Sequence, residues 1–150
     1  MTEHAIPSYV MMMAPTLVAL ETLGGSATTD QLDAAVIARM GLTPAQMAEV
    51  IGGAGDPRPK VAHRLGLART HLRKLGYVTN AQRGVWALEP ASRAILDLDH
   101  DGAAAALQDQ DLEIRTRARA ERIARGQEPG PEVDPDLEPD ELGDILNDSY

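Results

Sequence analysis

Apolar residues recur at helical spacing in several stretches of the first half of the chain. Residues 15–23 form one such stretch, which ends at the helix-stopping pair Gly24-Gly25. The segments 28–31 and 43–46 each have a threonine followed three residues later by a glutamine, the pattern of a capping box. They predict two further helices, one that ends at Gly41 and one that runs to Gly52.

A third periodic stretch predicts a basic helix. Val61, Leu65, Ala68, Leu72 and Leu75 recur at spacings of four, three, four and three residues, and Gly76 follows. On a helical wheel the side opposite this stripe carries His63, Leu67, Thr70 and Lys74, with Lys60 and Arg73 beside them and with Arg64, Arg69 and His71 on the flanks. We therefore expect one buried stripe and a basic face directed away from the core.

The next segment has the pattern of a β-hairpin. Residues 77–80 and 85–88 are short β-prone runs, joined by 81–84 with Gly84 where a left-handed residue is needed. Glycine and proline make residues 52–59 a predicted loop. Three helices, the last of them basic, followed by a short hairpin are typical of a winged helix-turn-helix in a mostly α protein.

The remainder of the chain divides into a charged helix and an acidic tail. A polar break at 99–102 precedes a predicted helix over 103–125, whose apolar positions are sparse: Leu107, Leu112, Ile114 and Ile123. Residues 127–150 are rich in proline and acids and are expected to be disordered. Three roles stay open for this tail: solvation, competition with DNA for the basic face, or partner docking through Leu142, Ile145 and Leu146.

Charge is distributed unevenly along the chain. The net charge is −9, yet residues 56–93 have eight bases and two acids (+6), whereas 127–150 have nine acids and no base.

There is no cysteine, no basic leader before the apolar run 9–20, and no stretch long enough to span a membrane, so a cytoplasmic protein is expected. His63 and His71 lack neighbouring metal ligands, and no nucleophile has a base and an acid beside it. We expect no metal, no cofactor and no enzymatic activity.

The basic segment resembles the N-terminal domain of the Mrr family of restriction proteins. The similarity is carried by Arg64, Leu67-Ala68-Arg69, Leu72, Gly76-Tyr77 and Arg83-Gly84-Val85-Trp86, and it extends over residues 6–96. It implies a winged-helix domain over 1–98, followed by the helix (99–126) and the tail (127–150). Leu67 departs from the aromatic residue usual in the family. The lysine of the family's nuclease domain has no counterpart after Leu96, so nuclease activity is not expected.

These observations predict a protein that binds double-stranded DNA as a regulator or as the recognition component of a restriction system. The basic helix would enter the major groove and the hairpin would contact the backbone. The expected contact residues are Arg58, Lys60, His63, Arg64, Thr70, Arg73, Lys74, Gln82 and Arg83. Arg64 and Arg69 could instead be structural ion-pair partners, and Trp86 is expected in the core. The alternative function is a protein-interaction module, in which the helix at 103–125 pairs with a copy of itself or with another chain, or the acidic tail docks a partner. The protein partners expected are a second copy of the chain or a separate nuclease subunit.

Overall fold

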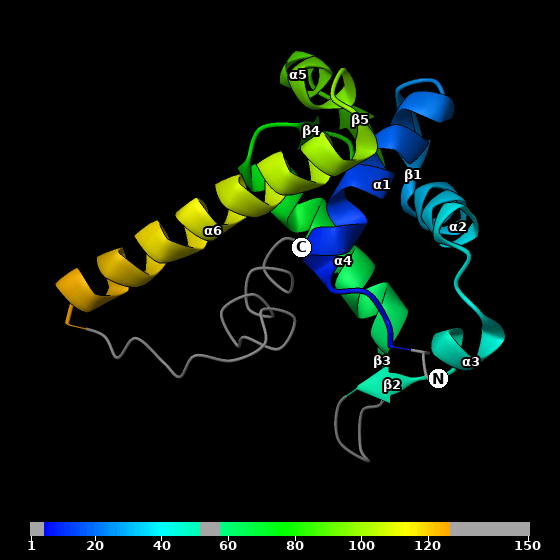
Figure 1. Ribbon diagram of the computed structural model, residues 1–150, viewed down its shortest axis with the longest axis horizontal. Coiled ribbons are helices and arrows are strands. Elements are labelled where there is room, and N and C mark those ends of the chain that lie inside the picture. The colour runs from blue at the N-terminus through cyan, green and yellow to red at the C-terminus, as the bar shows by residue number, and fades with distance from the viewer. Residues whose placement is uncertain (1–4, 52–57, 127–150) are drawn as a thin grey trace.

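The computed structural model describes residues 5–51 and 58–126, and this part of the chain is mostly helical (Figure 1). Helix α1 (Tyr9–Thr22) lies at its centre and packs against α2, α4 and α6. Met12, Leu17 and Leu20 on α1 are fully buried. Among the described residues, no helix is long and apolar enough to cross a membrane.

Both predicted capping boxes are present. Helix α2 (Thr29–Met40) begins with the reciprocal hydrogen bonds of Thr28 and Gln31 and ends at Gly41, whose φ is 66°. Helix α3 (Pro44–Met47) begins with the second capping box, which Thr43 and Gln46 form.

Helix α3 is much shorter than predicted. Helix α3 ends at Met47, and the chain then enters β2 (Val50–Ile51), which pairs antiparallel with β3 (Arg58–Pro59). The prediction of a helix running to Gly52 is therefore wrong, because strand pairing with a later segment replaces its final turn. Most of the predicted loop, residues 52–57, lies outside the described residues, and its last two positions form β3.

The predicted hairpin is present and joins a three-stranded sheet. Strands β4 (Val78–Thr79) and β5 (Val85–Leu88) pair antiparallel, and Gly84 before β5 has a φ of 77°. Strand β1 (Ser26–Thr28) pairs antiparallel with the other edge of β5, which gives the order β1-β5-β4. The hairpin is thus fastened to the segment that leads into α2.

Two helices follow the sheet. A 3-10 turn (Pro90–Ser92) leads into the short helix α5 (Arg93–Leu96), and α6 (His100–Ala124) comes after it. Asp99 caps α6 by accepting the Gly102 N–H at 2.7 Å, so the predicted polar break is the N-terminus of this helix. Figure 1 shows the second half of α6 running past the other helices. The predicted tail, 127–150, lies outside the described residues.

Candidate nucleic-acid interface

Helix α4 (Lys60–Lys74) has one narrow solvent-facing side. Ala62, Gly66, Arg69 and Arg73 are exposed or half-buried and follow one another at spacings of four, three and four residues. We call these four residues the α4 face. Its first half has small side chains and its second half has arginines, and Lys74 is exposed at the end of the helix.

Four positions of α4 lie elsewhere than predicted: Arg64, Leu67, Thr70 and His71 are all buried. Leu67 and Thr70 are buried, with exposed fractions of 0% and 4%. Arg64 is also buried, and its Nη1 donates to the carbonyl oxygens of Ile6 (2.7 Å) and Pro7 (3.2 Å). The expectation that these side chains lie on an exposed basic face is wrong, because neighbouring elements cover more of α4 than its single apolar stripe. Arg64 is structural: it fixes the segment before α1.

The other predicted contact residues are accessible to different degrees. Lys60 is partly buried, with its Nζ 3.9 Å from Glu49 Oε1. The remaining positions form two groups by exposure: Arg58, His63 and Arg73 are half-buried, whereas Lys74, Gln82 and Arg83 are exposed.

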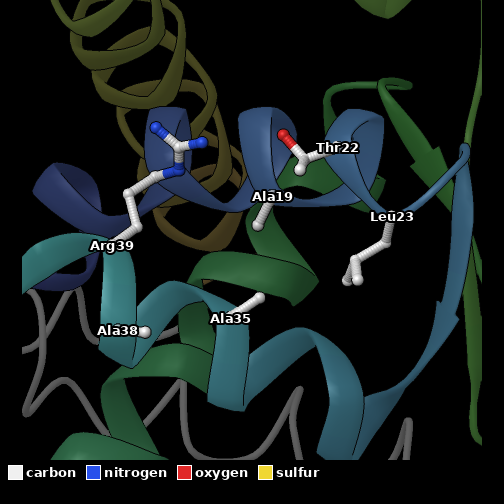
Figure 2. Close-up of a pocket in the computed structure, with 6 residues that line it drawn as sticks. All are labelled: Ala19, Thr22, Leu23, Ala35, Ala38 and Arg39. Atoms are coloured by element: carbon white, nitrogen blue, oxygen red, sulfur yellow. The ribbon is translucent and has the colours of Figure 1, made fainter.

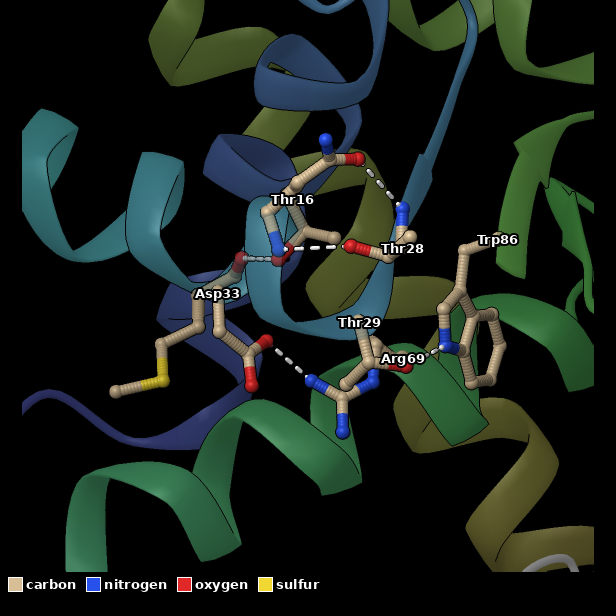
Figure 3. A network of polar contacts seen from close by, with 8 residues as sticks. Thr16, Thr28, Thr29, Asp33, Arg69 and Trp86 are labelled. Atoms are coloured by element: carbon tan, nitrogen blue, oxygen red, sulfur yellow. Dashed lines mark hydrogen bonds and ion pairs between the residues drawn. The ribbon is translucent and has the colours of Figure 1, made fainter. Parts of the chain in front are cut away.

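A polar cluster connects the α4 face to α2 and to the sheet (Figure 3). Arg69 forms an ion pair with Asp33 of α2, and its guanidinium carbon lies 5.6 Å from the centre of the Trp86 ring. Trp86 in turn donates its indole N–H to the hydroxyl of Thr29 at 3.0 Å. Burial raises the pKa of Asp33 above its ordinary value, although the charge and hydrogen bond of Arg69 partly offset that effect. The ion-pair alternative for Arg69 is confirmed, as is the expectation that Trp86 is buried.

The same cluster fixes the hairpin beside α2. The Thr29 N–H donates to the Gly84 carbonyl at 3.0 Å, so the turn is held at the N-terminus of that helix. Gln82 and Arg83 directly precede Gly84 and are exposed. Since Arg69 contacts Trp86, the α4 face adjoins the strand that follows this turn.

The opposite side of α4 has a buried polar cluster that no sequence pattern indicated. His71 Nδ1 contacts Asp111 of α6, and Tyr9 of α1 donates its hydroxyl to the same carboxylate at 2.7 Å. Arg115 Nε lies 3.0 Å from Asp111. Burial alone would raise the pKa of Asp111, but the hydrogen bond and charge of His71, with the hydrogen bonds of Tyr9 and Arg115, lower it below 3.8. This cluster fastens α6 to α1 and α4.

One surface hollow, of about 370 Å³, lies between α1 and α2 (Figure 2). Its lining residues are Ala19, Thr22, Leu23, Ala35, Ala38 and Arg39. Thr22 and Arg39 are the polar members of this lining, and Figure 2 shows them on different helices. This hollow lacks the convergent polar groups typical of a ligand or catalytic site.

A family model of the Mrr N-terminal domain matches residues 9–97, which is more than half of the 150 residues. The match includes α1, α2, α4 and the three-stranded sheet, and it therefore includes both the α4 face and the hairpin. No curated protein and no solved structure matches the chain. The extent of the match shows that the chain belongs to the Mrr N-terminal domain family.

Proposed function

We propose that the chain is a winged-helix protein that binds double-stranded DNA with the α4 face and the turn before β5. The order α1, β1, α2, α4, β4, β5 supports this assignment, as does the sheet order β1-β5-β4. In such a domain the last helix before the hairpin is the recognition helix, and the hairpin is the wing. Here those elements are α4 and the turn of residues 80–84.

The contact between Arg69 and Trp86 is the observation that carries the proposal. It joins the middle of the α4 face to the strand that follows the wing, so a duplex lying along this side of the molecule would meet both. Ala62 and Gly66 would allow the first half of α4 to approach the groove closely. Arg73 would supply a cation for phosphate at the other end of the face.

Charge distribution gives independent support. The segment that contains α4 and the wing, residues 56–93, has a net charge of +6 in a chain whose net charge is −9. The rest of the chain has a net charge of −15, so phosphate would be attracted to this segment more than to the chain as a whole. Lys74 and Arg83 are exposed cations in the basic segment, and we expect them to contact the DNA backbone.

The proposed role is recognition or regulation without catalysis by this stretch of chain. If the chain serves a restriction system, cleavage of the DNA would be carried out by a nuclease domain or by a separate nuclease subunit. No cofactor is required, because hydrogen bonds and ion pairs to the duplex supply the binding energy.

A matched pair of charge reversals tests the proposal. Arg73→Glu changes the α4 face, whereas Arg93→Glu makes the same charge change on α5, where the side chain is 57% exposed and pairs with Glu21. Binding to a fluorescent duplex of random sequence should weaken at least tenfold for Arg73→Glu and about twofold or less for Arg93→Glu. Equal weakening would mean that only net charge matters, and unchanged binding by Arg73→Glu would refute the proposed face. Circular dichroism would verify that both variants fold.

A further inference from the structure

Four arginines form one stripe along the second half of α6. Arg115, Arg119, Arg122 and Arg125 follow one another at spacings of four, three and three residues. At about 100° per residue they lie within an arc of about 120°, and they span about 15 Å of helix length. All four are half-buried or exposed. We call these four residues the arginine stripe.

The acids that could neutralise the two middle arginines do not lie on α6. Side chains three or four positions apart are neighbours on a helix surface, whereas adjacent residues do not face each other. At those positions Arg119 has two arginines, a threonine and an isoleucine, and Arg122 has two arginines, an alanine and a glycine. By contrast, Arg117 lies off the stripe and pairs with Glu113 at 3.5 Å. An acid that neutralises the middle of the stripe therefore belongs to another segment.

The stripe also sets like charges beside one another. Each of its arginines lies three or four positions from the next, and like charges at this spacing destabilise a helix. The buried residues of α6 all precede the stripe: Ala103, Leu107 and Asp111. Packing on the core therefore does not offset the repulsion within the stripe. A polyanion that lay along the stripe would remove it.

The chain has a matching polyanion shortly after α6. Residues 127–150 have nine acids and no base, and every second residue from 132 to 140 is an acid: Glu132, Asp134, Asp136, Glu138 and Asp140. We call residues 132–140 the acidic segment. In an extended chain alternate side chains share one side and lie about 6.5 Å apart. Successive arginines of the stripe are about 4.5 to 6 Å apart along the helix axis, which is a similar spacing.

We propose that the acidic segment docks on the arginine stripe of the same chain and runs antiparallel to α6. The helix ends at Gly126, whose φ is 80°, and residues 126–131 include two glycines and two prolines, which favour a reversal of the chain. Tethering through so short a linker gives the acidic segment an effective concentration of the order of millimolar at the stripe. This proposal does not rest on DNA binding by the α4 face.

The position of the stripe favours the tail over a duplex on the α4 face as its occupant. Asp111 lies in the same arc of α6 as the stripe and pairs with Arg115 at 3.0 Å. Asp111 also contacts His71, which is two residues from Arg69 and therefore about 200° around α4 from it. The stripe thus continues the side of α6 that packs on α4 away from the α4 face. A tail docked there would leave the α4 face open.

Zero-length carbodiimide cross-linking of the full chain tests where the tail docks. The reagent joins carboxylates to primary amines in contact with them, and the chain has only two lysines, Lys60 and Lys74, both on α4. Arg122→Lys keeps the charge and places an amine in the stripe. Arg39→Lys is the matched control, because it makes the same change at an exposed position of α2.

The cross-links would be identified by mass spectrometry, with each yield divided by the acetylation rate of the same amine. Cross-links from the acidic segment to position 122 should be at least about fivefold more abundant than those to position 39 or to either lysine of α4. Mixing unlabelled and nitrogen-15-labelled chains would show whether each cross-link lies within one chain.

A spin label tests the same contact without a cross-linker. The chain has no cysteine, so Leu137→Cys places a single label between two acids of the acidic segment. Arg119→Glu combined with Arg122→Glu should shorten the rotational correlation time of the label at least about twofold. About 0.5 M NaCl should have the same effect on the labelled chain with its arginines intact. Arg73→Glu combined with Lys74→Glu reverses two charges on α4 and should leave the spectrum unchanged. Circular dichroism would verify that all variants stay helical.

Three results would overturn the proposal. Preferential cross-links to Lys60 and Lys74 would place the tail on α4. Cross-links that join labelled to unlabelled chains would mean that the tail docks on a second copy. Few cross-links to position 122, with a label equally mobile before and after the reversal of Arg119 and Arg122, would mean that another polyanion, such as nucleic acid, meets the stripe.

Discussion

The guanidinium carbon of Arg69 lies 5.6 Å from the centre of the Trp86 ring. This contact joins the solvent-facing side of α4 to the strand that follows the hairpin turn. Asp33 holds the guanidinium from α2, and Thr29 accepts the Trp86 indole N–H. The relative orientation of the proposed recognition helix and wing is therefore set by side chains that are themselves mostly buried. Such support from surrounding residues keeps a binding surface in one geometry.

Trp86→Ala should destabilise the fold by roughly 3 to 5 kcal/mol, because the indole is 7% exposed and bridges β5 to α2 and α4. Urea denaturation followed by circular dichroism would measure the free energy of unfolding. A variant of normal stability that had lost DNA binding would contradict the assignment of Trp86 to the core.

Replacing Lys60, Arg73 and Lys74 together by alanine should weaken binding to any duplex without unfolding the protein. None of the three is fully buried. The slope of log K against log salt concentration should become shallower by up to about three. Because Lys60 lies 3.9 Å from Glu49, it should contribute least, which the single variants would show. Unchanged affinity of the triple variant would exclude this face.

Arg83→Glu should weaken DNA binding at little cost in stability, because the side chain is exposed in the turn of the hairpin. Thermal unfolding should shift by no more than a few degrees. Gln82→Ala, in the same exposed turn, should have a smaller effect on binding because it removes no charge. Equal affinities of Arg83→Glu and the unchanged protein would show that the turn does not contact DNA.

Asp111→Asn should lower the free energy of unfolding at neutral pH by about 3 to 5 kcal/mol, because it breaks a buried pair with His71. Since the pKa of Asp111 is lowered by folding, the ionised carboxylate contributes stability above its ordinary value of 3.8 and loses it as the pH falls through the folded pKa. The unchanged protein should therefore lose more stability than the variant between about pH 5 and pH 3. Parallel acid dependences in urea denaturation would contradict this account.

Local chemistry made part of the fold predictable. The reciprocal bonds of Thr28 with Gln31 and of Thr43 with Gln46 need only four consecutive residues, and both capping boxes are present. Gly84 similarly indicates a positive φ in its own turn, and its φ is 77°. Sequence alone therefore located the starts of two helices and the hairpin.

Long-range contacts made the rest unpredictable. Arg64 is buried because carbonyl groups of Ile6 and Pro7, more than 50 positions away, accept its hydrogen bonds. His71 is buried because Asp111 of α6 reaches it. A helical wheel shows which residues share a side of a helix, but it does not show how many sides are covered. For the same reason Thr70 was predicted to face solvent, but it is buried in the structure.

The salt dependence of binding to random duplex DNA tests the central claim most directly. Association constants would be measured by fluorescence anisotropy from about 50 to about 300 mM NaCl. If Lys60, Arg73, Lys74 and Arg83 meet phosphates, log K should fall linearly with log salt concentration, with a slope of about −3 to −4. Undetectable binding at the lowest salt, or an affinity that does not change with salt, would contradict a DNA-binding function.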